Sequence, residues 1–166
     1  MFDKLNHRTI VIVLLLIALV IIVGFFIFVS NKEQVADVEL NQPKLPKTTK
    51  LVIKDVEISA EIADEPGKIV KGLSGRTSLG ENSGMYFVLG KRKIASFWMK
   101  DMKFPLDIIW IDNGGIVYIV EEAPTPDDNI PSFTPTQPAT HVLEVNAGFA
   151  KKHSIKIGDR VEVKRN

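Results

Sequence analysis

An unbroken apolar run, IVIVLLLIALVIIVGFFIFV, fills residues 10–29 and contains no charged residue and no proline. In a helix, twenty residues span about 30 Å, which matches the hydrocarbon core of a bilayer. The run is longer than the apolar part of a signal peptide, and no small-residue cleavage pattern follows it. A helix in the core of a small domain is rarely apolar on every face. The run therefore predicts a single, uncleaved transmembrane anchor over residues 10–29.

The charges beside this run predict its orientation. Lys4 and Arg8 precede it, whereas Lys32 follows it among several acidic residues. The positive-inside rule then places residues 1–9 in the cytoplasm and the chain after Ser30 outside the cytoplasmic membrane, in a periplasm or at the cell exterior. The chain has no cysteine, which is consistent with this location and excludes disulfides and thiol chemistry.

The chain after the anchor divides into a tether and a head. Residues 30–50 are polar and include Pro43 and Pro46, so we predict a flexible tether. Residues 51–166 are enough for one extracytoplasmic domain with its own core. After Ser30 the chain holds 19 Lys and Arg against 19 Asp and Glu. Such a neutral head lacks the basic field that nucleic acid requires, so nucleic acid is not an expected partner.

The sequence of the head predicts a mainly β domain. Apolar and polar residues alternate over residues 52–62, as in a half-buried strand. Asn113-Gly114-Gly115 is a hairpin signal, because these residues tolerate positive φ. We predict a sandwich or open barrel of about seven to nine short strands and one or two short helices, with a long proline-rich loop over 124–138. The remaining predicted strands are 85–89, 94–100, 106–111, 116–120, 142–145 and 160–163, and the predicted helices are 66–73 and 147–153.

Two groups of residues in the predicted strands are candidates for chemistry. Strand alternation places Trp98 and Lys100 on one face and Phe97 and Met99 on the other. Asp107 and Glu144 lie within apolar strands, where a carboxylate must be paired, hydrogen-bonded or exposed.

The cations Arg76 and Lys100 are candidate partners of these two carboxylates, and Asn146 shares a strand face with Glu144. Two carboxylates also suit acid–base chemistry. His141 and Glu144 have a metal-like spacing, but positions three apart on a strand point to opposite faces. We therefore expect no metal site and no cofactor.

Several short motifs follow one another along the head. They are Gly72-Leu73, Gly84-Met85, FWMK at 97–100, PLDIIWID at 105–112, VLEVNAG at 142–148 and GDRV at 158–161. Their order resembles the domain of unknown function 192 family. Where that family usually has Gly-Leu-Met, this chain has Gly72-Leu73-Ser74. The resemblance implies a mostly β, sandwich-like domain that is often exported or tethered, and it implies no activity.

Three functions remain open at this point. The first is a membrane-tethered binding module of the cell envelope for a small ligand or a polymer segment. The second is an envelope assembly protein that docks on a membrane protein, and the third is a hydrolase that cleaves polysaccharide with Asp107 and Glu144. No catalytic residue is assigned, and we lean against an enzyme. The candidate ligand-binding residues are Arg76, Trp98, Lys100, Asp107, Glu144 and Asn146.

Overall fold

The computed structural model describes residues 16–17, 19–23, 25–26, 28, 47–127 and 130–164. The chain divides into two units, Met1–Leu45 and Pro46–Asn166. The described residues of the first unit are helical and their side chains are exposed. Among the described residues, no helix has both the length and the apolar character needed to cross a membrane. Residues 1–9, tether residues 30–46 and half of the predicted anchor lie outside the described residues.

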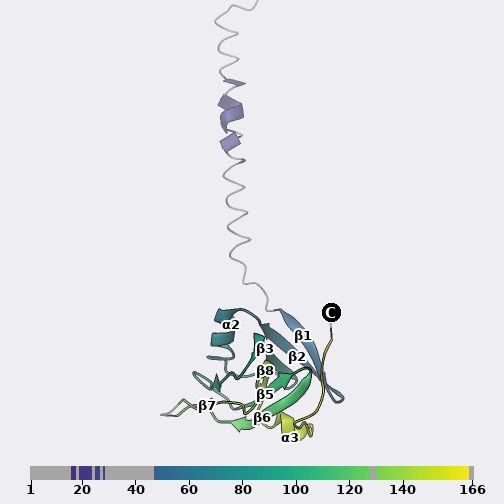
Figure 1. The fold of residues 1–166 in the computed structure, drawn as a ribbon. Helices are drawn as coiled ribbons and strands as arrows, with labels where there is room; N and C mark the ends of the chain where they lie inside the picture. The colour runs from purple at the N-terminus through teal and green to yellow at the C-terminus, as the bar shows by residue number, and fades with distance from the viewer. Residues whose placement is uncertain are drawn as a thin grey trace, which may run out of the picture. The chain divides into compact units, whose positions relative to one another are not determined.

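The second unit is mainly β, as predicted, with nine strands and two short helices among its described residues (Figure 1). Seven strands form one sheet in the order β6-β5-β8-β3-β2-β1-β9, and β4 pairs with β7 in a second, two-stranded sheet. The elements are β1 Thr48–Ile53, β2 Val56–Ala63, α2 Pro66–Lys71, β3 Ser83–Lys93, β4 Phe97–Trp98, β5 Leu106–Asp112, β6 Gly115–Ala123, β7 Ser132–Phe133, β8 Ala139–Asn146, α3 Phe149–Lys152 and β9 Val161–Lys164.

The large sheet curls into a half-barrel, because its two ends approach each other. Near the start of edge strand β6, Gly115 forms an isolated bridge with Arg160, which directly precedes the other edge strand, β9. The Ile116 amide also donates to the Asp159 carbonyl at 3.0 Å. The strands pair antiparallel except for β2 and β3, which are parallel and joined through α2. The architecture is therefore closer to the predicted open barrel than to the sandwich.

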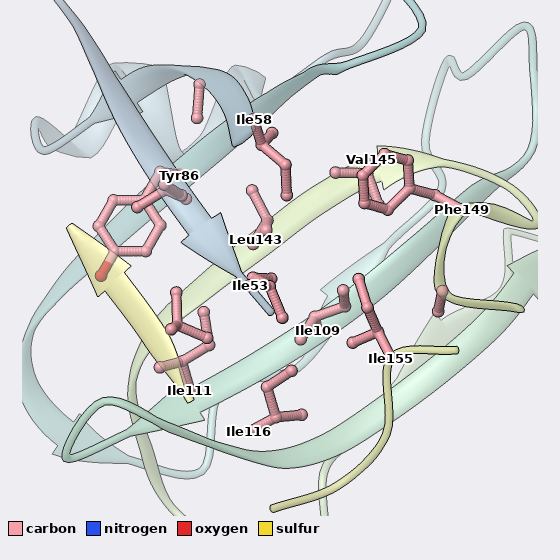
Figure 2. Close-up of a cluster of buried hydrophobic side chains, with 14 residues drawn as sticks. Ile53, Ile58, Tyr86, Ile109, Ile111, Ile116, Leu143, Val145, Phe149 and Ile155 are labelled. Atoms are coloured by element: carbon pink, nitrogen blue, oxygen red, sulfur yellow. The ribbon is translucent and has the colours of Figure 1, made fainter. Parts of the chain in front are cut away.

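Each face of the curled sheet carries a hydrophobic cluster. The first lies inside the curl, where Ile53 of β1, Leu143 of β8 and Phe149 of α3 all contribute side chains (Figure 2). The second covers the other face of β3, β5 and β8, and it includes Phe87, Phe97 and Trp110. The strand period of two sends alternate residues of β8 into the two clusters. A polar residue in β8 must therefore enter one of the clusters or an adjoining space.

Several predicted element boundaries were wrong. The 52–62 pattern spans two strands, because the chain turns at Lys54, whose φ is 54°. β1 begins at Thr48, within the range of the predicted tether. The 94–100 run forms only the short strand β4, and its partner β7 lies inside the proline-rich loop. In contrast, the predicted hairpin at Asn113-Gly114-Gly115 is confirmed as the connection of β5 and β6.

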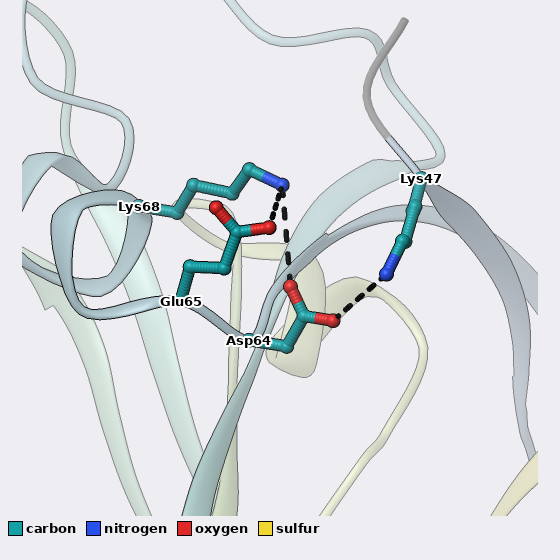
Figure 3. Close-up of polar contacts among 4 residues, drawn as sticks. All are labelled: Lys47, Asp64, Glu65 and Lys68. Carbon is teal, nitrogen blue, oxygen red and sulfur yellow. Dashed lines mark hydrogen bonds and ion pairs between the residues drawn. The ribbon is translucent and has the colours of Figure 1, made fainter. Parts of the chain in front are cut away.

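Exposed ion pairs join the start of β1 to the end of β2 and to α2 (Figure 3). Lys47 Nζ lies 3.3 Å from Asp64 Oδ2, and Lys68 Nζ lies 4.0 Å from the other oxygen of Asp64. Lys68 also contacts Glu65 at 3.3 Å. Exposed pairs of this kind contribute at most about 1 kcal/mol each. Lys68 belongs to α2, which forms one wall of the site described next.

Candidate functional site

A cavity of about 280 Å³, here called the inner pocket, adjoins the second hydrophobic cluster. Ile69 and Val70 of α2 line one part of it, and Phe87 and Leu89 of β3 line another. Trp98 of β4 and Glu144 of β8 also contribute to its surface. The pocket is therefore built mainly from apolar and aromatic side chains with one acidic group, a composition typical of small-molecule sites.

The end of α2 leaves space beside that acidic group. The helix stops at Gly72, whose φ of 50° and ψ of −135° suit glycine rather than a side-chain residue. A Cβ atom placed on Gly72 would lie 3.5 Å from Phe87 Cζ and 3.9 Å from Glu144 Oε2. Gly72 thus brings the chain past Phe87 and the carboxyl group without filling the space between them.

Glu144 is the most unusual residue of the pocket. It lies between Met85 and Ile108 in the sheet register and is only 5% exposed. Among the described residues, no side chain or backbone group donates a hydrogen bond to its carboxyl group or forms an ion pair with it. Desolvation by burial raises the pKa of Glu144 to about 8. At neutral pH it is therefore mostly protonated, and it can donate a hydrogen bond into the pocket.

Trp98 and Lys100 lie together beside this pocket. Trp98 is 48% exposed, and Lys100 Nζ lies 5.7 Å from the centroid of its ring. Phe97 and Met99 are buried, so the predicted alternation of this segment is confirmed. A second cavity of about 500 Å³, here called the outer hollow, is lined by Lys100 and Asp101. The two cavities also share lining residues, namely Val70, Lys71, Ser74 and Trp98.

Asp107 lies elsewhere and has backbone partners. Its side chain is fully buried, and Oδ1 accepts hydrogen bonds from the amides of Glu122 at 2.8 Å and Gly148 at 3.1 Å. Oδ2 accepts a third bond, at 2.8 Å, from the Ala150 amide in the first turn of α3. The candidate pairing of Asp107 with Arg76 or Lys100 was therefore wrong. The carboxylate joins β5 to β6 and to the start of α3.

Arg76 and Asn146 also make contacts within the protein. Arg76 forms a bidentate salt bridge with Glu61, with N–O distances of 2.5 and 2.8 Å. These hydrogen bonds lower the pKa of Glu61. Asn146 Nδ2 donates to the carbonyl oxygens of Leu79 at 3.2 Å and Gly80 at 2.9 Å. Neither side chain lines the inner pocket or the outer hollow. Arg76, one of the two candidate partners of Glu144, is therefore paired with Glu61 instead.

The sheet register separates the two carboxylates. Asp107 pairs with Val145, and Ile108 pairs with Glu144. Directly paired residues point to the same face, so Asp107 and Glu144 point to opposite faces of the sheet. They cannot act together as an acid–base pair on one substrate. The structure instead brings together Trp98 with Glu144 at the inner pocket and Trp98 with Lys100 at the outer hollow.

His141 is the histidine whose spacing from Glu144 resembles that of a metal-ligand pair. The ring of His141 stacks on Tyr86 with centroids 4.9 Å apart, on the face opposite Glu144. Burial lowers the pKa of His141. Within the part of the chain that the structure describes, no group of three His, Cys, Asp or Glu residues is placed to hold a metal ion.

Sequence reasoning missed several pocket residues. Phe87 was assigned only to a strand, and Lys71 and Lys93 carried no signal that would place them at the same pocket as Glu144. Their proximity depends on the parallel pairing of β2 with β3 across α2, which no local pattern reveals. One signal was present in Gly72, because a glycine that ends a helix often marks a close approach of the backbone to a neighbour.

Comparisons with known proteins identify relatives of this fold. A protein of Sinorhizobium meliloti 1021, provisionally described as a transcription regulator, has a TM-score of 0.64 and 28% identity, covering 71% of this chain and 95% of its own. A protein of unknown function from Novosphingobium aromaticivorans DSM 12444 has a TM-score of 0.63 and 30% identity, covering 73% of this chain and 89% of its own. A comparison with curated proteins found no match. The model of the DUF192 family, described as "Uncharacterized ACR", matches residues 48–163, and the chain therefore belongs to the DUF192 family.

Proposed function

We propose that the domain binds a small organic molecule in the inner pocket, with Glu144 as the group that orients it. The observation that carries this proposal is a carboxyl group, 5% exposed, that lines a cavity and has no partner among the described residues. A buried polar group without a partner costs free energy. A ligand that accepts a hydrogen bond from the protonated carboxyl removes that cost.

The walls of the pocket support a compact, mostly apolar ligand body. Phe87 and Phe97 both line the cavity, and their rings meet edge to face with centroids 4.8 Å apart. Aromatic walls of this kind bind flat or aliphatic groups by burial of apolar surface. The volume of about 280 Å³ is at the lower end of the usual range for ligand pockets. The bound part of the ligand is therefore small.

The proposal extends to where the domain acts. We infer that residues 10–29 anchor the chain in the cytoplasmic membrane and that the domain binds its ligand outside it, in the cell envelope. The support is the uninterrupted apolar run and the cations that precede it. A tethered binding domain near the membrane surface captures molecules without itself diffusing away.

One observation favours a second function, docking on another envelope protein. Val70 and Trp98 are large apolar residues with 64% and 48% exposure, and both line the inner pocket and the outer hollow. Exposed apolar surface of this kind also suits protein contacts. The hydrolase alternative has no comparable support, because the sheet register separates Asp107 from Glu144.

A cavity-filling variant tests the binding proposal. Ile69→Trp places a larger side chain in the wall of the inner pocket, whereas Ile157→Trp changes an exposed residue that lines neither cavity. Small-molecule fragments are screened by the shift in melting temperature, since a ligand of the folded state raises it. Fragments should stabilise the wild type and Ile157→Trp but not Ile69→Trp. Equal stabilisation of all three proteins, or no stabilising fragment, would contradict the proposal.

A further inference from the structure

We propose that the ligand is an organic anion whose charged group lies in the outer hollow between Lys71 and Lys100, an inference that rests on the proposed binding function. The inner pocket alone would accept many small apolar molecules. The outer hollow beside it, and the charged side chains around the two cavities, narrow the chemical class of the ligand.

The two cavities form one elongated site. Val70, Lys71, Ser74 and Trp98 line both of them. A molecule whose apolar body contacts Phe87 and Glu144 therefore leaves the inner pocket past Trp98 and enters the outer hollow. The ligand then has two different ends, an inner hydrogen-bond acceptor and an outer group that meets the residues around Lys100.

Unpaired ammonium groups surround this elongated site. Lys71 and Lys93 line the inner pocket and Lys100 lines the outer hollow, and none of the three has an ion-pair partner among the described residues. By contrast, the nearby Lys47 and Lys68 are paired with acidic residues. Among the described residues that line the outer hollow, Asp101 is the one acidic residue. With Glu144 protonated, the site has a net positive charge that attracts an anion.

The outer hollow is held in shape by contacts between two loops. The Ser74 hydroxyl donates to the Lys100 carbonyl at 2.7 Å, and the Gly75 amide donates to the Asp101 carbonyl at 2.9 Å. The Lys100 ammonium lies over the Trp98 ring. These contacts fix the backbone that presents Lys100 next to the end of α2, where Lys71 lies. An anion in the hollow would meet cations whose positions are set by the fold.

A cationic ligand should bind less well at this site than an anionic one. An ammonium group would form an ion pair with Glu144 only if the carboxyl ionised, and its charge would enter a site that already contains Lys71 and Lys93. Like charges at short range oppose binding, so we expect amines to bind more weakly than neutral molecules of the same shape.

A matched fragment set tests this inference on the full chain. Each aromatic skeleton is present as a carboxylate, a carboxamide and an amine, and dissociation constants are measured by ligand-observed NMR. Carboxylates should bind about fivefold more tightly than the amides of the same skeleton, which corresponds to one partly exposed charge-assisted contact. This preference should disappear in Lys71→Gln/Lys100→Gln and persist in the matched control Lys91→Gln/Lys103→Gln, whose lysines line neither cavity.

The outcomes separate the two proposals. If amides bind as tightly as carboxylates, if amines bind most tightly, or if the preference survives in Lys71→Gln/Lys100→Gln, the anion inference is wrong while binding at the inner pocket stands. If no skeleton binds in any charge form, or if Ile69→Trp binds them all unchanged, the proposed binding function is wrong as well.

Discussion

Replacing Glu144 with glutamine should change how the stability of the protein depends on pH. Glutamine keeps the shape and hydrogen-bonding capacity of the protonated acid but does not titrate. In the folded protein the pKa of Glu144 is raised to about 8 by burial, whereas the ordinary value is 4.5. Between these two values the folded state retains a proton that the unfolded chain releases. The free energy of unfolding of the wild type therefore falls as pH rises through this window.

The size of the effect follows from the same numbers. One proton retained by the folded state gives a slope of about 1.4 kcal/mol per pH unit. Between about pH 5.5 and about pH 7.5, the wild type should lose about 3 kcal/mol relative to Glu144→Gln. The whole window from 4.5 to about 8 corresponds to about 5 kcal/mol, an upper value because the denatured chain and a partly relaxed pocket both reduce it.

Urea denaturation at a series of pH values measures this difference, with fluorescence of the buried Trp110 as the signal. Groups common to both proteins, including Lys71 and Lys93 at the pocket, cancel in the comparison. A Glu121→Gln variant serves as the control, because Glu121 is exposed on β6, and its curve should run parallel to that of the wild type. If the Glu144→Gln curve is also parallel to the wild type, the carboxyl titrates normally and the reasoning is refuted.

Three further predictions concern the fold and the location of the chain. Asp107→Ala leaves three backbone amides without an acceptor and should lower the free energy of unfolding by about 3 to 5 kcal/mol. Asp107→Asn should lower it by about 1 to 3 kcal/mol, because the NH2 group of asparagine would face the N–H of Ala150. A wild-type urea midpoint in both variants would contradict the structural role of Asp107. A fragment of residues 46–166 should fold alone with a β-rich circular dichroism spectrum, and a helical or unfolded spectrum would count against this unit. Lys103→Cys supplies the single thiol of the chain at an exposed position, and an impermeant maleimide should label it in intact cells; labelling only after lysis would reverse the proposed topology.

The parts of the fold that local pattern determines were predictable. Alternation in Phe97 to Lys100 and the glycine-rich turn after Asp112 each depend on a few adjacent residues, and both were predicted correctly. The turn at Lys54 was missed, although the buried positions change there from odd numbers in β1 to even numbers at Ile58 and Ala60 of β2, because Lys54-Asp55 is not one of the glycine-containing pairs that mark a tight hairpin. Asp107 was identified as a buried carboxylate in need of partners, but its partners are backbone amides, which every sequence contains and no motif marks.

The candidate site could not be predicted from the sequence, because it is formed by residues that are far apart along the chain. Glu144 stood out in the sequence as a carboxylate in an apolar strand, but nothing in the chain showed that Gly72 and Phe87 lie beside it. That proximity arises from the parallel pairing of β2 and β3 and the helix between them. Register, not composition, also decided that Asp107 and Glu144 point to opposite faces.

A crystal structure of the chain with the tightest-binding carboxylate fragment would test the central claim most directly. The account predicts the apolar body of the fragment in the inner pocket, an acceptor atom within about 3.2 Å of a Glu144 carboxyl oxygen, and the carboxylate between Lys71 and Lys100. A fragment bound at another surface, with no density beside Glu144, would contradict it.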